Sequence, residues 1–123
     1  MPDHLRHLVW VGCSKVADAI AATDILIRDC NYGVVTLDVR EANPRELARI
    51  PSTTWHRMRL AVEDAQAALV VLTTSPVVPS VAWRLELMGK MTLGRTPLAA
   101  LKTTIEVRCV RERERETNWR VSA

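Results

Sequence analysis

The chain opens with apolar runs that show no alternation with polar residues. Three such runs, residues 8–13, 34–39 and 67–73, are rich in Val and Leu and end at polar or turn-forming residues. Continuous apolar runs of this length are typical of strands that are buried on both faces of a sheet. The pattern therefore predicts three buried, parallel strands in an α/β protein.

An amphipathic helix is predicted between the first two runs. Apolar residues recur on one helical face from Val16 to Ile27, so we expect a helix that Ser14 caps and that ends before Gly33. A strand, a helix and a second strand within about thirty residues have the spacing of a βαβ unit, whose crossover is right-handed.

Two further helices are predicted before the third apolar run. Asn43 stands before Pro44 and is placed to cap a short helix that Pro51 ends. A longer helix is expected to begin at Ser52, because apolar residues then recur at helical spacing. This apolar stripe consists of Trp55, Met58, Val62 and Ala65.

The hydrophobic period changes to two beyond residue 80. Apolar and polar residues alternate at 81–88 and again at 105–109, which predicts two half-exposed strands. We expect both to extend one edge of the parallel sheet in antiparallel fashion. The alternating charges of residues 111–116 are typical of a solvated hairpin or loop.

The composition is that of an ordinary globular protein. The 123 residues, 48% apolar and 25% charged, predict a single packed domain over residues 1–123. The sequence has neither an apolar run of about 18 residues nor the pattern of a signal peptide, which predicts a cytoplasmic protein with no membrane partner. Cys13, Cys30 and Cys109 stand among aliphatic residues and are expected to be reduced core residues.

The positive charge of the chain is concentrated in one segment. The net charge is +3, and residues 40–59 carry five arginines against two glutamates, a local excess that equals the whole. Such a focused basic segment attracts phosphate backbones or acidic protein surfaces. Its arginines are Arg40, Arg45, Arg49, Arg57 and Arg59. Arginines on short amphipathic helices also pair with neighbours such as Glu46 and Glu63 or only solvate the surface, and this alternative stays open.

Asp38 is the strongest candidate for chemistry, because it ends a predicted parallel strand, and ligands of open α/β sheets collect at that edge. Nucleotide hydrolases use an aspartate in this position to hold magnesium or its water. Aspartates that only form a turn also end strands. Both interpretations stay open from the residues alone.

The rest of a nucleotide-hydrolysing site is missing from the sequence. No G-x-x-x-x-G-K-[ST] motif occurs, and the four glycines never cluster. No serine stands in a G-x-S-x-G elbow, and the spacing of His4, His7 and Cys13 matches no common zinc pattern. We therefore expect no catalytic residue, metal or cofactor. Trp10, Trp55 and Trp83 occupy apolar positions and are expected in the core.

The order of these segments resembles the second half of the RecA recombinase core, especially the ImuA-type proteins of bacterial translesion DNA repair. The resemblance covers residues 8 to 110 and rests on the strand with Trp10 to Cys13, the strand ending at Asp38, the stretch from Ile50 to Leu60 and the strand Ala68–Leu72. It implies a three-layer, mostly parallel sheet flanked by helices, with antiparallel edge strands, of which this chain forms a partial core.

By this resemblance, Asp38 takes the place of a vestigial magnesium-associated acidic residue. Residues 40–52 take the place of one DNA-facing loop, and the loop from Thr74 and Ser75 to Ser80 that of a second. Thr73 and Thr74 stand where recombinases have a nucleotide-sensing glutamine. The phosphate-loop half that precedes such a core is absent, so the resemblance implies a fragment, a misplaced start or one part of a split protein.

Three functions follow as alternatives. The first is an SOS-response accessory module for DNA repair and recombination, which binds DNA, including single strands, an error-prone polymerase or a RecA-type protein without hydrolysing ATP. The second is half of a split RecA-like ATPase whose phosphate loop lies on another chain. The third is an inert remnant whose exposed sheet edge makes it self-associate.

Overall fold

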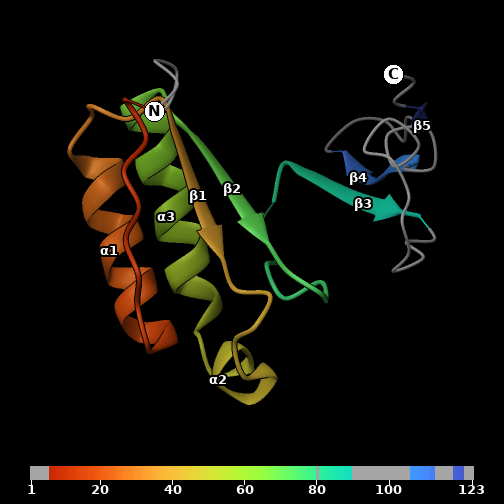
Figure 1. The fold of residues 1–123 in the computed structure, drawn as a ribbon, viewed down its shortest axis with the longest axis horizontal. Coiled ribbons are helices and arrows are strands. Elements are labelled where there is room, and N and C mark those ends of the chain that lie inside the picture. The colour runs from red at the N-terminus through yellow and green to blue at the C-terminus, as the bar shows by residue number, and fades with distance from the viewer. Residues whose placement is uncertain (1–5, 80, 90–105, 113–117, 121–123) are drawn as a thin grey trace. The chain divides into compact units, whose positions relative to one another are not determined.

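The computed structural model describes residues 6–79, 81–89, 106–112 and 118–120 (Figure 1). Its contacts divide the chain into two compact units, Met1–Ser80 and Val81–Ala123. The first unit is a small α/β structure with a parallel sheet, and the second is an antiparallel sheet.

The sheet of the first unit consists of two parallel strands, β1 (Val34–Asp38) and β2 (Ala68–Leu72). They pair in register from Val34 opposite Ala68 to Asp38 opposite Leu72. Between them the chain forms α2 (Pro44–Ala48) and α3 (Ser52–Ala65). This is the helical crossover that a parallel pair requires, so the predicted strands 34–39 and 67–73 are confirmed.

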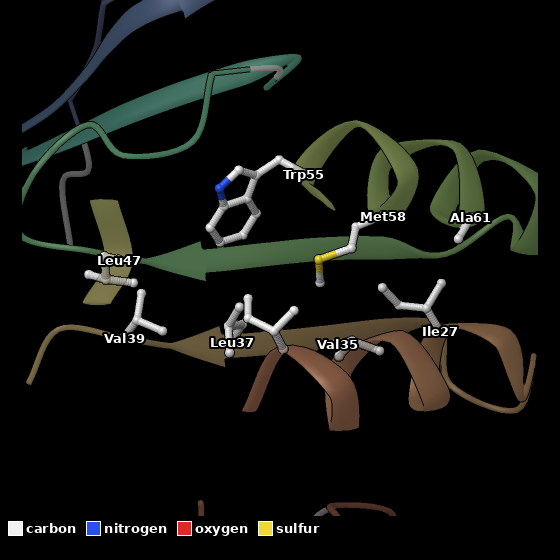
Figure 2. Packing of buried hydrophobic residues seen from close by; sticks show 9 residues of the cluster. Ile27, Val35, Leu37, Val39, Leu47, Trp55, Met58 and Ala61 are labelled. Atoms are coloured by element: carbon white, nitrogen blue, oxygen red, sulfur yellow. The ribbon is translucent and has the colours of Figure 1, made fainter. Parts of the chain in front are cut away.

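The helices α1 (Val16–Arg28) and α3 pack against each other, and α1 contacts β1 while α3 contacts β2. Figure 2 shows the core between them, where Ile27 of α1 and Met58 of α3 face Val35 and Leu37 of β1. Met58 is only 1% exposed. The predicted apolar faces of both helices are confirmed, and Ala61 joins the stripe of α3.

The predicted ends of α1 are wrong in detail. Its N-cap is Lys15, with no side-chain cap, instead of Ser14. Beyond its last turn the left-handed residue is Cys30, with φ 60°, instead of a glycine. The predicted cap of α2 is confirmed, because the Asn43 side chain accepts a 2.9 Å hydrogen bond from the Arg45 backbone N–H.

The helices cover one face of the parallel sheet. Val35 and Leu37 are buried on that face, whereas their neighbours Val34 and Thr36 are exposed. Opposite Thr36, Val70 is 43% exposed, so the prediction that residues 67–73 are buried on both faces of the sheet is wrong. In the described part of the chain, no helix covers this outer face, and the third layer stays a prediction.

Residues 8–13 do not form the predicted first strand. They are extended but unpaired, and all of them are exposed, with Trp10 at 85%. The predicted burial of Trp10 and Cys13 is therefore wrong. An apolar run shows that a segment is suited to burial, but it does not show that another strand lies beside it. Cys30 is exposed as well, whereas Cys109 is buried as expected.

The second unit contains β3 (Trp83–Met88), β4 (Glu106–Glu112) and β5 (Asn118–Arg120). They form an antiparallel sheet in the order β3-β4-β5. The predicted strands and their antiparallel pairing are confirmed, but they form a sheet of their own instead of extending the β1–β2 sheet. Trp83 is exposed, against the expectation of core packing.

Candidate nucleic-acid interface

The carboxyl ends of β1 and β2 bring two predicted loops to the same edge. The Val39 backbone N–H donates a 3.0 Å hydrogen bond to the Leu72 carbonyl, which continues the strand pairing by one residue. The segment after β1 therefore starts beside the segment after β2. The first carries Asp38 and Arg40, and the second carries Thr74 and Ser75.

Asp38 is bound by a residue of its own loop. Its Oδ1 accepts hydrogen bonds from the Arg40 backbone N–H at 3.1 Å and from Arg40 Nε at 2.9 Å. Its Oδ2 accepts a third, from Arg40 Nη2, at 2.7 Å. The carboxylate thus has the two-point contact with a guanidinium that gives the strongest pairs of this kind.

This contact changes the acidity of both groups. The side-chain and backbone hydrogen bonds from Arg40 lower the pKa of Asp38 to about 2. The same side-chain hydrogen bond raises the pKa of Arg40. Asp38 is therefore ionised at neutral pH, and its charge is balanced by Arg40.

The hydrogen bonds from Arg40 bear on whether Asp38 binds magnesium or only forms a turn. A magnesium ion bound to Asp38 would have to compete with the Arg40 guanidinium, which hydrogen-bonds to both carboxylate oxygens. Among the described residues, no three His, Cys, Asp or Glu side chains gather as a metal site. The geometry favours the turn-forming aspartate, which Arg40 holds in place.

The loop after β2 is anchored at both ends. The Thr73 hydroxyl donates a 2.6 Å hydrogen bond to the Ser75 carbonyl, and the Val77 N–H donates to the same oxygen at 2.9 Å. Val77 and Val78 pack against the core, while Thr74 and Ser75 are exposed. The tip of the loop therefore presents two polar side chains to solvent.

The other four arginines of the basic segment lie on or next to helices. Arg45 belongs to α2 and Arg49 follows its last turn, whereas Arg57 and Arg59 belong to α3. Arg59 donates a 3.1 Å hydrogen bond to Glu63 and is paired with it. Within the described residues, the side chains of Arg45, Arg49 and Arg57 form no hydrogen bond or ion pair, and all three are exposed.

The structure thus divides the five arginines into two groups. Arg40 and Arg59 are neutralised by acidic neighbours. Arg45, Arg49 and Arg57 have guanidinium groups that no described residue pairs with, and these groups could bind an anion. The segment from β1 through α2 is held to the core by Leu47, which Figure 2 shows beside Val39.

The pairing of Asp38 with Arg40 was not predicted from the sequence. The signal was present as Asp-Val-Arg at the end of an apolar run, since an aspartate often accepts a hydrogen bond from the backbone two residues on. The pairing of Arg59 with Glu63 has the i,i+4 spacing of helical ion pairs and could be predicted.

A small α/β unit with a basic segment beside the carboxyl ends of its parallel strands is the class of structure that these observations define. No family model, no curated protein and no solved structure matches the chain. Among the described helices, none has the length and apolar character that a membrane crossing requires.

Proposed function

We propose that the chain is a RecA-like, ImuA-type accessory module that binds single-stranded DNA through phosphate contacts and does not hydrolyse ATP. The observation that carries the proposal is the set of three exposed arginines, Arg45, Arg49 and Arg57, whose side chains have no partner among the described residues. Free guanidinium groups pair readily with phosphates, and such contacts carry no sequence information.

The position of these arginines supports the proposal further. Arg45 lies on α2 and Arg49 directly after it, in the segment that follows the carboxyl end of β1, and Thr74 and Ser75 are exposed in the loop that follows the neighbouring strand β2. Hydroxyl side chains and helix-borne arginines are common phosphate partners. The pairing of Asp38 with Arg40 removes a negative charge that would repel a nucleic acid at this edge.

A salt titration tests this function. A fluorescently labelled single-stranded DNA is titrated with the protein at several salt concentrations, and binding is followed by fluorescence anisotropy. We expect a dissociation constant of roughly 10⁻⁴ to 10⁻⁶ M near physiological salt, with a steep loss of affinity as salt rises. The Arg45→Ala/Arg49→Ala/Arg57→Ala variant should bind more weakly and with a shallower salt slope.

A variant with the same loss of charge provides the control. Lys15→Ala/Arg28→Ala/Arg108→Ala removes three cations outside the basic segment, and Arg28 and Arg108 are already paired with Asp24 and Glu86. Its salt slope should stay close to that of the parent. If the parent does not bind at low salt, or if both variants bind alike, the segment is not a DNA site and an acidic protein such as a polymerase subunit becomes the better candidate.

One observation favours the alternative of a split ATPase. The outer face of the β1–β2 sheet is exposed in the described part of the chain, with Val34 64% exposed, and a second polypeptide with a phosphate loop could cover it. ATP hydrolysis that appears only after such a chain is added, and that Asp38→Asn abolishes, would support this alternative.

A further inference from the structure

The strand β3 has a strand partner on one side only, as far as the described residues show. In the sheet order β3-β4-β5 it pairs with β4, and no described strand lies along its outer edge. The side chains of Leu85, Glu86 and Leu87 are exposed. An open edge presents a row of backbone N–H and C=O groups that can bind another strand.

β3 lacks the residues that usually block such an edge. Proteins protect edge strands with proline, lysine or a bulge, and residues 83–88 contain neither proline nor lysine. The pairing with β4 has one irregularity, which follows Arg84. The next residue of β3 skips Val110 and pairs with Cys109, so the extra residue belongs to β4. β3 therefore keeps a regular period of two along its length.

The two faces of β3 differ in character. Trp83, Leu85 and Leu87 lie on one face, and each of them is more than half exposed. The opposite face carries one charge of each sign, Arg84 and Glu86. A strand that pairs with this edge must therefore offer apolar side chains on one face and charges of both signs on the other.

A second copy of β3 meets this requirement in the antiparallel orientation. With Leu85 opposite Leu85 of the second copy, Trp83 lies opposite Leu87 on the apolar face. On the other face, Arg84 lies opposite Glu86, and the two-fold axis repeats both pairs. Opposite charges and large apolar side chains that face each other across two strands stabilise a sheet.

The charges also disfavour the neighbouring registers. A pairing centred on Arg84 or on Glu86 places like charges opposite each other, which is destabilising. A pairing shifted by one residue places apolar side chains opposite charged ones, because successive residues face opposite sides. Two copies aligned in parallel and in register bring like charges side by side. The pattern therefore selects one antiparallel register, centred on Leu85.

We propose that the chain forms a two-fold symmetric dimer in which the outer edges of two β3 strands pair in this register. The Glu86 carboxylate already accepts a 3.0 Å hydrogen bond from Arg108. In the dimer it would lie between Arg108 of its own chain and Arg84 of the second copy. A two-fold contact is closed, so this edge joins two chains and no more. The proposal concerns assembly and does not depend on whether the basic segment binds DNA.

Charge reversal tests the dimer, with the molecular mass measured by sedimentation and light scattering. The parent should be dimeric, whereas Arg84→Glu and Glu86→Arg each place like charges opposite each other and should weaken the dimer about tenfold or more. An equimolar mixture of the two variants has opposite charges at both positions and should recover the dimer. Arg28→Glu reverses an exposed charge on α1 and is the control that should stay dimeric.

Three results of these measurements would overturn the proposal. The first is a parent that stays monomeric at the highest concentration it reaches. The second is a dimer that both variants retain, which would mean that another surface joins the copies. The third is a mass that rises with concentration beyond two chains, which would mean open-ended association.

Cysteine cross-linking tests the register without altering the charges. In a background of Cys13→Ser and Cys30→Ser, which removes the two exposed thiols, Leu85→Cys places two thiols directly opposite each other across the axis. It should form a disulfide-linked dimer on mild oxidation. Leu87→Cys is the control on the same face, and it should cross-link well only when it is mixed with Trp83→Cys. Equal cross-linking of Leu85→Cys and Leu87→Cys alone would overturn the register.

Discussion

Arg40 holds Asp38 with three hydrogen bonds, two from its guanidinium group and one from its backbone N–H. Only Val39 separates the two residues, and its own N–H bonds to β2. A residue pair at the end of a strand thus turns the chain towards α2 while both charged groups stay exposed to solvent.

This pairing predicts a measurable change in acidity. In Arg40→Gln, the pKa of Asp38 should rise from about 2 towards its ordinary value of 3.8, because the charged hydrogen bonds are lost. A carboxyl NMR titration measures it directly. Arg45→Gln removes a nearby unpaired arginine and should leave the pKa of Asp38 unchanged.

The lowered pKa of Asp38 also makes the stability of the folded protein depend on pH. The pKa of Asp38 is lower in the folded protein, so its contribution to stability is complete above pH 4 and is lost as the pH falls towards 2. Urea unfolding of the parent and of Arg40→Gln between pH 5 and pH 2 should show a smaller loss of stability for the variant. Parallel curves over this range would contradict the pairing.

We expect no magnesium-dependent ATP hydrolysis by the purified chain. It has no phosphate loop to bind the β- and γ-phosphates, and both oxygens of Asp38 are engaged by Arg40. A phosphate-release assay should give the same background rate for the parent and for Asp38→Asn. Turnover that survives stringent purification and disappears in Asp38→Asn would contradict this prediction.

The helices cover only one face of the parallel sheet, so truncating a side chain to alanine should destabilise the protein more on the covered face than on the exposed face. Leu37 is 4% exposed under the helices, so Leu37→Ala should lower the free energy of unfolding by about 2–5 kcal/mol. Val70→Ala, on the exposed face of the neighbouring strand, should cost less than about 1 kcal/mol. Urea denaturation measures both, and equal costs would mean that the outer face is covered.

The left-handed residue after α3 predicts a stabilising substitution. Gln66 has φ 53° and ψ 38°, a conformation in which a side chain is disfavoured. Gln66→Gly should raise the free energy of unfolding by about 0.5–1 kcal/mol. The same change at the exposed residue Thr53, within α3, is the control and should be destabilising. Thermal unfolding of the two variants should shift in opposite directions.

Local patterns predicted the elements of the first unit well. The helical spacing from Val16 to Ile27 is confirmed, since Ile20, Thr23 and Ile27 face the core. The predicted cap formed by Asn43 and the predicted start of α3 at Ser52 are confirmed as well. These features depend on neighbours within one or two helical turns, which the sequence contains.

Pairing between distant segments could not be predicted in the same way. Residues 8–13 and Ala68–Leu72 have the same apolar character, yet only the second run pairs with β1. The strands beyond residue 80 have the expected period of two, but the period does not determine which sheet they join. For the candidate site, the sequence located the basic segment, and the structure showed which arginines are already paired.

The link between α3 and β2 is only Gln66 and Ala67. The Ala67 N–H donates a 3.2 Å hydrogen bond to the Val62 carbonyl. The rotation of α3 about its axis therefore determines which side chains of β2 face the core. One inserted residue here would turn Leu69 and Val71 out of the core, because successive strand residues face opposite sides. The link between α3 and β2 is therefore a place where a change in chain length would be costly, although both of its residues lie outside the helix and the strand.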